Sequence, residues 1–253
     1  MDSTSSRVDV PKYSKLLNKS INNLKILIPK EFMKNIDSNL LIIFENLIHQ
    51  FIRLGAKIEY IDLYDPKLFI AVYYTLALAE CSSNLSKYDG IRYGFLTNKL
   101  GKSIDEIYFE SRSNGFGDEV KNRIILGSYI LSSKHYDSFY LKAQKIRSQI
   151  YNYYISSLNE TNVIMTLTSP STAFGFNENI SDLNMYLLDL YTCGANLAGL
   201  PAISFPCGFL NNLPVGAQLI AAPYKEEILL NVVNEYQKIT NWHNFMPKGI
   251  ELI

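Results

Sequence analysis

The chain has few cysteines and few histidines, and their scarcity argues against two kinds of site. Cys81, Cys193 and Cys207 lie far apart and form no Cys-x-x-Cys pair. We therefore expect buried free thiols in a reducing compartment rather than a disulfide framework. The three histidines are equally scattered, and no two of them stand at the spacing of metal ligands. A zinc site is not expected.

The chain also lacks an excess of charge of either sign. Lys and Arg together number 24, as do Asp and Glu. This balance argues against a free-standing nucleic-acid-binding protein, which normally carries a basic surface, although contact with RNA through a partner stays open. The polar first residues predict no signal peptide, and the absence of a run of about 18 apolar residues predicts no membrane span. Heavy use of Asn, Ile, Lys and Tyr suits an AT-rich genome, so we expect a cytoplasmic bacterial protein or a plastid protein.

The apolar residues that are present predict an α/β fold. Residues 24–29 form a short apolar run that ends at Pro29, as expected of a buried strand. Residues 39–54 follow with helical spacing and end at Gly55, and residues 57–63 alternate like a strand. A strand, a helix and a strand in this order predict two parallel strands in a covered sheet.

The remaining pattern extends this prediction to a mixed sheet covered by helices. Further strands are expected over 162–168, 202–208 and 215–221, with a turn at 211–214 between the last two. Further helices are expected over 66–85, from Ser103, and over 118–132, 136–157, 183–197 and 225–239. The length of 253 residues allows one large domain or two small ones.

The most specific stretch is Asn-Leu-Ala-Gly-Leu-Pro-Ala-Ile-Ser-Phe-Pro-Cys-Gly at 196–208. Further strings of similar specificity are Asp-Ser-Thr-Ser at 2–5, Ala-Glu-Cys-Ser-Ser-Asn-Leu at 79–85, Tyr-Asp-Gly-Ile-Arg-Tyr-Gly at 88–94, and the segment 115–127. Together, and in this order, they resemble the C-terminal half of the amidase-signature family. Within that family, they are similar to the A subunits of glutamyl-tRNA(Gln) amidotransferases. It implies one partial amidase-signature domain over 1–253.

The catalytic loop of that family is absent from this chain. The loop is a Gly-Gly-Ser-Ser-Gly-Gly segment that supplies a nucleophilic serine, with a lysine as base, whereas no two glycines are adjacent here. A serine nucleophile needs a neighbouring base and oxyanion donors. The serine pairs at 82–83 and 132–133 lie in helical contexts without a Gly-rich turn. We therefore predict no catalytic residue in this chain.

The resemblance implies a glutamine-binding role for three residues. Arg123 resembles the family's arginine for the α-carboxylate, Asp189 the aspartate for the amine, and Tyr73 a tyrosine that contacts glutamine. A planar guanidinium suits a carboxylate because it can bind both oxygens. From the residues alone, Arg123 could equally be an exposed helix cation and Tyr73 a core aromatic. Asp189 could form an ion pair on an otherwise apolar helix, where an unpaired carboxylate would be costly.

The resemblance also implies a reaction and its partners. The family's A subunit hydrolyses glutamine through an acyl-enzyme and passes ammonia to the B subunit, where ATP and Mg²⁺ act on glutamyl-tRNA. The chain would then bind glutamine, associate with the amidotransferase subunits B and C and with an N-terminal half if the gene is split, and meet tRNA only through the complex. It would hold no cofactor of its own. The alternatives are a non-catalytic remnant or scaffold subunit, and half of a different amidase.

Four further features have structural explanations from the sequence. Asp89 and Arg92 are expected to form an ion pair within their loop. Asn196 is expected either to cap a helix or to bond backbone near the active centre. Cys207 is expected to be a small buried residue. The aromatic run at 136–140 is expected to pack in a core rather than to stack on bases.

Overall fold

A computed structural model of the chain describes residues 5–34, 36–98, 101–178 and 181–247, of which 182 and 183 without their side chains. Of the string at 2–5, only Ser5 is among them. The fold forms two compact units. Unit 1 comprises Met1–Ile70 and Gln149–Ile253, and unit 2 comprises Ala71–Ser148. Each is described by itself, and the single partial domain expected from the resemblance stays a prediction.

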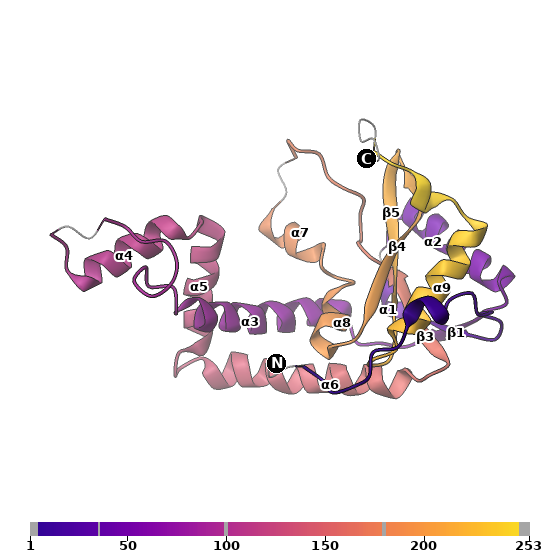
Figure 1. Ribbon diagram of the computed structural model, residues 1–253, viewed down its shortest axis with the longest axis horizontal. Helices are drawn as coiled ribbons and strands as arrows, with labels where there is room; N and C mark the ends of the chain where they lie inside the picture. The colour runs from indigo at the N-terminus through magenta and orange to yellow at the C-terminus, as the bar shows by residue number, and fades with distance from the viewer. Residues whose placement is uncertain (1–4, 35, 99–100, 179–180, 248–253) are drawn as a thin grey trace. The chain divides into compact units, whose positions relative to one another are not determined.

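Unit 1 is built on a five-stranded mixed sheet in the order β2-β1-β3-β5-β4 (Figure 1). The strands are β1 (Lys25–Pro29), β2 (Lys57–Ile61), β3 (Asn162–Leu167), β4 (Ala202–Leu210) and β5 (Leu213–Ile220). β1 pairs in parallel with β2 and β3, whereas β5 runs antiparallel to β3 and β4. The predicted mixed sheet and the parallel β1–β2 pair are therefore confirmed.

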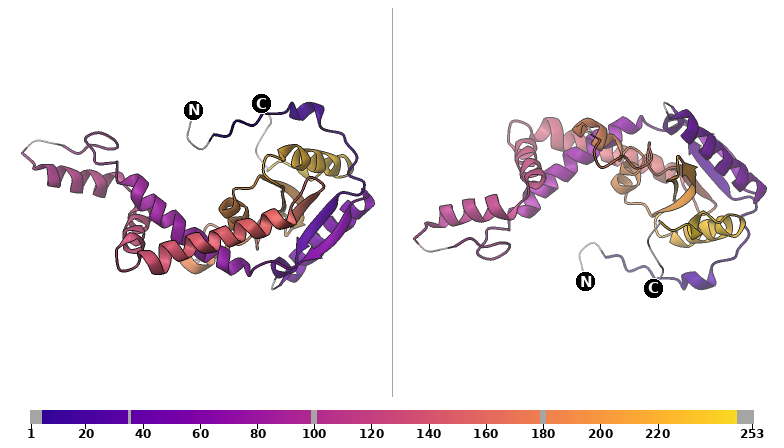
Figure 2. Two further views of the ribbon diagram at one scale, coloured as in Figure 1. Left: turned by 90° about the horizontal axis from the view of Figure 1, so that it is seen from below. Right: turned by 90° about the horizontal axis from the view of Figure 1, so that it is seen from above.

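Two helices of unit 1, α2 (Ser38–Arg53) and α9 (Glu226–Ile239), pack on this sheet. The unit also holds α1 (Lys30–Met33), α7 (Asp182–Leu187) and α8 (Cys193–Ala198). α2 contacts both edge strands, β2 and β4, and α9 also packs on β4 (Figures 1 and 2). Between them Phe51 of α2 stacks on Tyr236 of α9, with ring centroids 5.3 Å apart. Burying these rings stabilises the unit, because removing apolar area from water drives folding.

Local sequence explains where these elements begin and end. The Asp37 carboxylate accepts hydrogen bonds from the backbone of Asn39 and Leu40 and so caps α2. α2 ends before Gly55, which has φ +90°, as the sequence predicts. The β4–β5 hairpin turns on two residues, Asn211 and Asn212, both with positive φ, rather than on the four expected. Asparagine tolerates this conformation, which suits the twist of a two-residue hairpin.

Unit 2 is helical. It holds most of α3 (Pro66–Leu85), all of α4 (Ile104–Gly115) and α5 (Asp118–Leu131), and the start of α6 (Lys142–Ser157). Ser103 and Glu106 form a reciprocal capping box that starts α4. α3 and α5 approach closely at Gly127, where an added Cβ would lie 2.0 Å from the carbonyl oxygen of Leu78. Only glycine fits such a crossing.

Three sequence expectations need correction. The helix expected over 136–157 begins with a π-helical segment, Tyr136–Leu141, before α6. The helix expected over 183–197 is two short helices, α7 and α8, separated by turns at 188–192. There the Thr192 hydroxyl donates to the carbonyl of Asp189, and such side-chain bonds compete with the helical pattern. The covered sheet holds only in part at β2: α2 packs against this strand, but β2 is an edge strand with one neighbour, and its Tyr60 is 51% exposed.

One apolar helix also departs from expectation. Among the described residues α3 alone is long and apolar enough to cross a membrane, judged by length and composition. A single helix of this kind is weak evidence, because the core helix of a soluble protein meets the same criteria.

Candidate functional site

The residues expected to bind glutamine are divided between the two units. Tyr73 lies on α3 and Arg123 on α5, both in unit 2, whereas Asp189 belongs to unit 1. The structure brings α3 and α5 together at Gly127, one helical turn after Arg123. A meeting of all three side chains around one ligand stays a prediction.

Arg123 is a partly exposed cation that is held along its own helix. Its Nε donates to Oε1 of Glu119 at 2.8 Å, and 41% of its side chain is exposed. A pair four residues apart on a helix is a weak interaction, typically about 0.3–0.5 kcal/mol. This pair by itself would cost a ligand carboxylate little to displace.

Tyr73 is half-buried on α3. Its ring lies edge-on to that of Tyr74, with centroids 5.2 Å apart and an interplanar angle of 84°. This contact orients the ring, and a phenol oriented in this way can contact a bound amino acid through its face or its hydroxyl.

Asp189 lies in the turn between α7 and α8, not on the apolar helix expected from the sequence. Its carbonyl accepts from the backbone N–H of Thr192 and of Cys193, each at 3.1 Å. Burial raises the pKa of the Cys193 thiol to about 12, and the negative charge of the Asp189 carboxylate contributes to this rise. Asp189 itself is half-buried.

The turn that carries Asp189 is anchored to the sheet by a buried amide. Nε2 of Gln218, on β5, donates to the carbonyl of Tyr191 at 2.6 Å and to Oγ1 of Thr166 on β3 at 2.9 Å. The Tyr191 hydroxyl donates to the carbonyl of Phe32 at 3.2 Å. Sequence reasoning did not select Gln218, although a glutamine in the apolar run 215–221 is a usable signal, because a buried amide needs partners.

The specific stretch 196–208 folds from α8 into β4. Gly199 ends α8 with φ +62°, a left-handed cap, and Pro201 then prevents the helix from continuing. The Asn196 amide donates to the Thr192 carbonyl at 3.0 Å, so it bonds within its helix rather than capping it from outside. Cys207 is buried as expected, and burial raises the pKa of its thiol to about 12.

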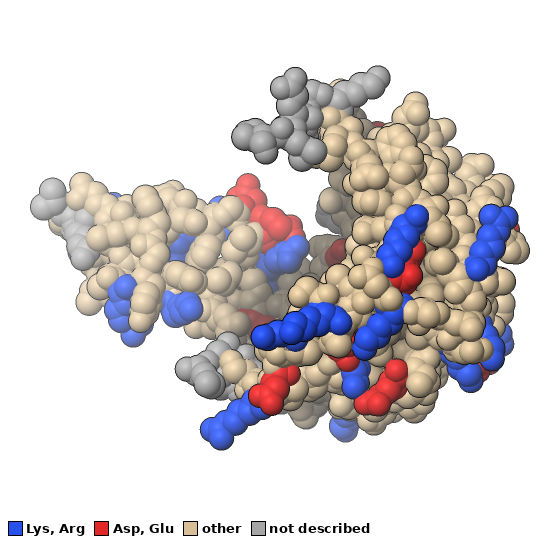
Figure 3. All heavy atoms as spheres, turned by 45° about the vertical axis from the view of Figure 1, so that its right-hand side comes forward, with Lys and Arg blue, Asp and Glu red and all other residues tan. Residues whose placement is uncertain are grey.

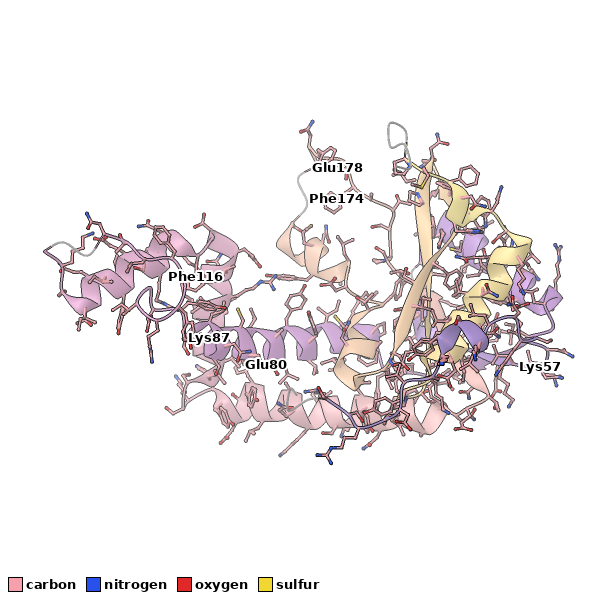
Figure 4. The ribbon with its side chains drawn as sticks, in the orientation of Figure 1. Lys57, Glu80, Lys87, Phe116, Phe174 and Glu178 are labelled. Atoms are coloured by element: carbon pink, nitrogen blue, oxygen red, sulfur yellow. The ribbon has the colours of Figure 1, made fainter. Side chains whose placement is uncertain are left out.

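A loop between β3 and α7 lies next to these elements in sequence and carries Phe174 and Glu178 (Figure 4). At its start Oγ1 of Thr168 and Oγ of Ser204 lie 2.9 Å apart, which ties the loop to β4. Further along, the side chains of Phe174 and Phe176 are exposed. Exposed aromatic rings of this kind are typical of a surface that a further chain segment or partner covers.

The loop at 88–94 in unit 2 is a structural feature. The Asp89 carboxylate accepts from the backbone N–H of Ile91 and of Arg92 and from Nε of Arg92, all within 2.9 Å. These bonds hold the pKa of Asp89 well below its usual range. The expected Asp89–Arg92 ion pair is confirmed.

Beside this loop lies a cavity of about 400 Å³, lined chiefly by Tyr88, Tyr93, Phe95 and Phe116. Arg112 fills part of its wall, with the guanidinium 5.1 Å from the centre of the Phe116 ring, and donates to the carbonyls of Leu85 and Tyr88. Lys87 lies over the Tyr88 ring on the same segment (Figure 4).

The aromatic run at 136–140 does not form a fully buried core. Tyr136 is 37% and Phe139 43% exposed. Phe139 instead packs with Tyr129 and His135, whose ring centroids are 4.1 Å apart.

The described residues contain neither a metal cluster nor a disulfide. All three cysteines are free, and no group of three or more His, Cys, Asp or Glu in this part of the chain is placed to hold a metal ion. On the face shown in Figure 3, basic and acidic side chains are interspersed.

The chain is similar to known proteins along nearly its whole length. The amidase family model matches residues 1–230. The A subunit of the glutamyl-tRNA(Gln) amidotransferase of Nitrosococcus oceani is 47% identical over 98% of the chain, and that of Dechloromonas aromatica is 45% identical over 99%. The chain covers 52% of each of these relatives, and so spans about half their length.

Solved structures agree in fold. The glutamyl-tRNA(Gln) amidotransferase A subunit from Thermotoga maritima superposes with a TM-score of 0.69 at 34% identity, over 91% of this chain and 45% of that one. A bacterial aryl acylamidase of the amidase-signature family superposes with a TM-score of 0.72 at 16% identity, over 98% of this chain and 50% of that one. At this lower identity the likeness concerns the fold alone.

Proposed function

This chain belongs to the amidase family, and on that premise we propose that it is the glutamine-recognition half of a glutamyl-tRNA(Gln) amidotransferase A subunit. The observation that carries the proposal is 47% identity to such a protein over 98% of the chain. The chain covers about half the length of this relative, which agrees with the C-terminal half expected from the sequence motifs.

In the proposed site, Arg123 binds the α-carboxylate of glutamine and Asp189 binds its α-ammonium group. Tyr73 contacts the substrate beside them. The partly exposed guanidinium of Arg123, which donates to Glu119 along its helix, supports this role, because a guanidinium suits a carboxylate. The half-buried Asp189, on a turn that Gln218 anchors, supports the second role, because a carboxylate held in place offsets the charge of an ammonium group.

The chemistry of glutamine hydrolysis would come from a catalytic half with the family's serine nucleophile and lysine base, which the given sequence does not contain. That half would belong either to the same protein or to a separate polypeptide. The assembled glutaminase would release ammonia to the B subunit, with ATP and Mg²⁺ acting there. The amidotransferase subunits B and C are the proposed partners, and the proposed compartment is the cytoplasm or a plastid.

A non-catalytic remnant or scaffold subunit is the second candidate function. The observation that favours it is the lack of adjacent glycines, and so of the serine-rich loop, in this sequence. Such a chain would keep the surface that stabilises its partner and hydrolyse nothing.

Reconstitution separates the two functions. The chain is purified with a polypeptide that carries the family's serine-rich loop, and ammonia release from glutamine is measured. Activity of the mixture, with none from either part alone, is the outcome expected of a recognition half. A stable complex without ammonia release would contradict that function and support the scaffold.

A further inference from the structure

Unit 1 contains a second cavity, of about 350 Å³, that none of the proposed glutamine-binding residues lines. It lies between α2, the end of β4 and a short 3₁₀ helix, η3 (Trp242–Asn244). The lining residues that carry the argument are Asn46, His49, Gln50 and Arg53 of α2, Phe209 of β4, and Trp242 of η3.

The helical wall of this cavity is basic and polar. Asn46, His49 or Gln50, and Arg53 follow one another at intervals of three or four residues, so they share one face of α2. The residues that line the cavity include Arg53 and His49 but no aspartate or glutamate. In the part of the chain that the structure describes, no hydrogen bond or ion pair engages the side chain of Arg53 or of His49. The cavity is therefore a local excess of positive charge and of hydrogen-bond donors in a chain of zero net charge.

One buried polar atom on the lining side chains, Oε1 of Gln50, lacks a partner among the described residues. Buried polar groups are normally paired, so an unpaired one on a side chain that lines a cavity indicates a bound group. The Trp242 indole N–H lies beside the buried hydroxyl of Tyr236 and interacts with it, so Trp242 offers the cavity its ring and not its N–H.

The opposite wall is aromatic. The rings of Phe209 and Trp242 have centroids 5.9 Å apart, and Phe245 packs on both, at 5.3 Å and 6.2 Å. A rigid aromatic wall facing a basic helix face suits a ligand with one anionic end and one flat or apolar end.

We propose that this cavity binds a small oxyanion, a phosphate or carboxylate group, held by Arg53 and His49. Asn46 adds a donor at the rim. Gln50 offers its carbonyl oxygen to a hydroxyl or amine on the same ligand. The rest of the ligand rests on the ring of Trp242.

The chain provides its own reporter for this site, because Trp242 is its single tryptophan. The full chain is titrated with inorganic phosphate, with acetate and with adenosine monophosphate, at ionic strength matched with chloride, and Trp242 emission is followed. We expect a saturable change with Kd of about 1 mM or tighter for at least one probe. The phosphate and acetate arms identify which oxyanion the site prefers, and the nucleotide arm tests the aromatic wall.

Matched variants decide whether Arg53 holds the anion. Arg53→Gln is expected to weaken binding about 10-fold or more, because it removes a charge-assisted contact. Arg53→Lys should retain part of the affinity. Lys57→Gln, which removes an exposed cation on β2 that does not line the cavity, should leave Kd unchanged (Figure 4). Circular dichroism of each variant reports whether it folds.

Two outcomes would overturn the proposal. One is the absence of any saturable change in Trp242 emission with all three probes, together with no heat of binding by calorimetry. The other is equal weakening by Arg53→Gln and Lys57→Gln, which would mean that the anions screen the surface rather than occupy the cavity.

Discussion

A Cβ atom on Gly194 would lie 2.3 Å from the hydroxyl oxygen of Tyr154. Phe69 closes the same space from α3, with its nearest ring carbon at 3.1 Å. The absence of a side chain at Gly194 therefore lets α8 lie against the buried Tyr154 ring.

Gly194→Ala is expected to destabilise unit 1 by about 1–3 kcal/mol, the usual cost of overpacking a filled core. Denaturant unfolding measures the change. Gly175→Ala is the matched control, because its Cβ would meet only ordinary contacts with the Glu178 side chain. Adding Tyr154→Phe should recover part of the loss by removing the oxygen. Equal stability of the two alanine variants would show that the fold adjusts at Gly194.

The pH dependence of stability should carry a contribution from Asp89. Its folded-state pKa is depressed by backbone and side-chain hydrogen bonds from Arg92 and by the Ile91 N–H. Between the folded pKa and the unfolded value of about 3.9, the unfolded chain binds more protons. The contribution is thus fully present above that unfolded value and is lost as pH falls toward the folded pKa.

Asp89→Asn should therefore lower Tm at pH 7 and flatten the fall in Tm below about pH 4. Thermal unfolding from neutral to acidic pH measures both effects. Asp105→Asn is a suitable control, since it removes a carboxylate that lies on α4 in the same unit. If Tm of Asp89→Asn falls as steeply at acidic pH as Tm of the unsubstituted protein, Asp89 does not make this contribution to stability.

The thiols should differ in reactivity in the native state. Burial raises the pKa of both Cys193 and Cys207 to about 12, so little thiolate forms on either near neutral pH. Cys81 is only partly buried. Native labelling with iodoacetamide should modify Cys81 first and the other two only after unfolding. Mass spectrometry of labelled peptides checks this, with Cys81→Ser as the control that should stay unlabelled.

In a reconstituted glutaminase, Arg123→Ala should mainly raise KM. The loss of a charge-assisted contact of roughly 1.5–3 kcal/mol corresponds to about a 10- to 150-fold fall in kcat/KM. Asp189→Ala should behave similarly, and Asp189→Asn should not restore activity, because a neutral amide cannot offset an ammonium charge. Steady-state ammonia release measures both constants.

Glu119→Ala is the matched control for Arg123, since it removes only the partner on the same helix. It should leave kcat/KM within about two-fold, in keeping with the small worth of a surface pair. Unchanged kinetics in Arg123→Ala and Asp189→Ala would exclude both residues from glutamine binding.

Much of the fold follows from local pattern. The all-buried β3, the capped α2 and the hairpin of β4 and β5 each carry a strong periodic or turn signal. A buried strand, a helix cap and a tight turn each depend on a few neighbouring residues, so their patterns can be recognised in a single sequence. The exposure of β2 was not predictable in this way. Apolar and polar residues alternate in the same way in an edge strand and in an inner strand, so only the order of the strands in the sheet distinguishes the two.

The site is less predictable from the chain. Asp189 falls in a run of apolar residues with helical spacing, yet the Thr192 hydroxyl and the Gln218 amide favour a turn there. Gln218 lies far along the chain from Asp189, on β5, so their association depends on tertiary pairing. Arg123 and Tyr73 carry no local signal beyond the family motif, because a helix cation and a helix tyrosine are common in any fold.

The Gln218 amide has a consequence for the kinetics of local opening. It joins the turn at 188–192 to β3 and β5, so the turn can detach only when the hydrogen bond from Gln218 to Tyr191 breaks. Its backbone amides should therefore exchange with solvent deuterium more slowly than those of the neighbouring surface loop. In Gln218→Leu that rate should approach the loop's, while the strands themselves remain protected.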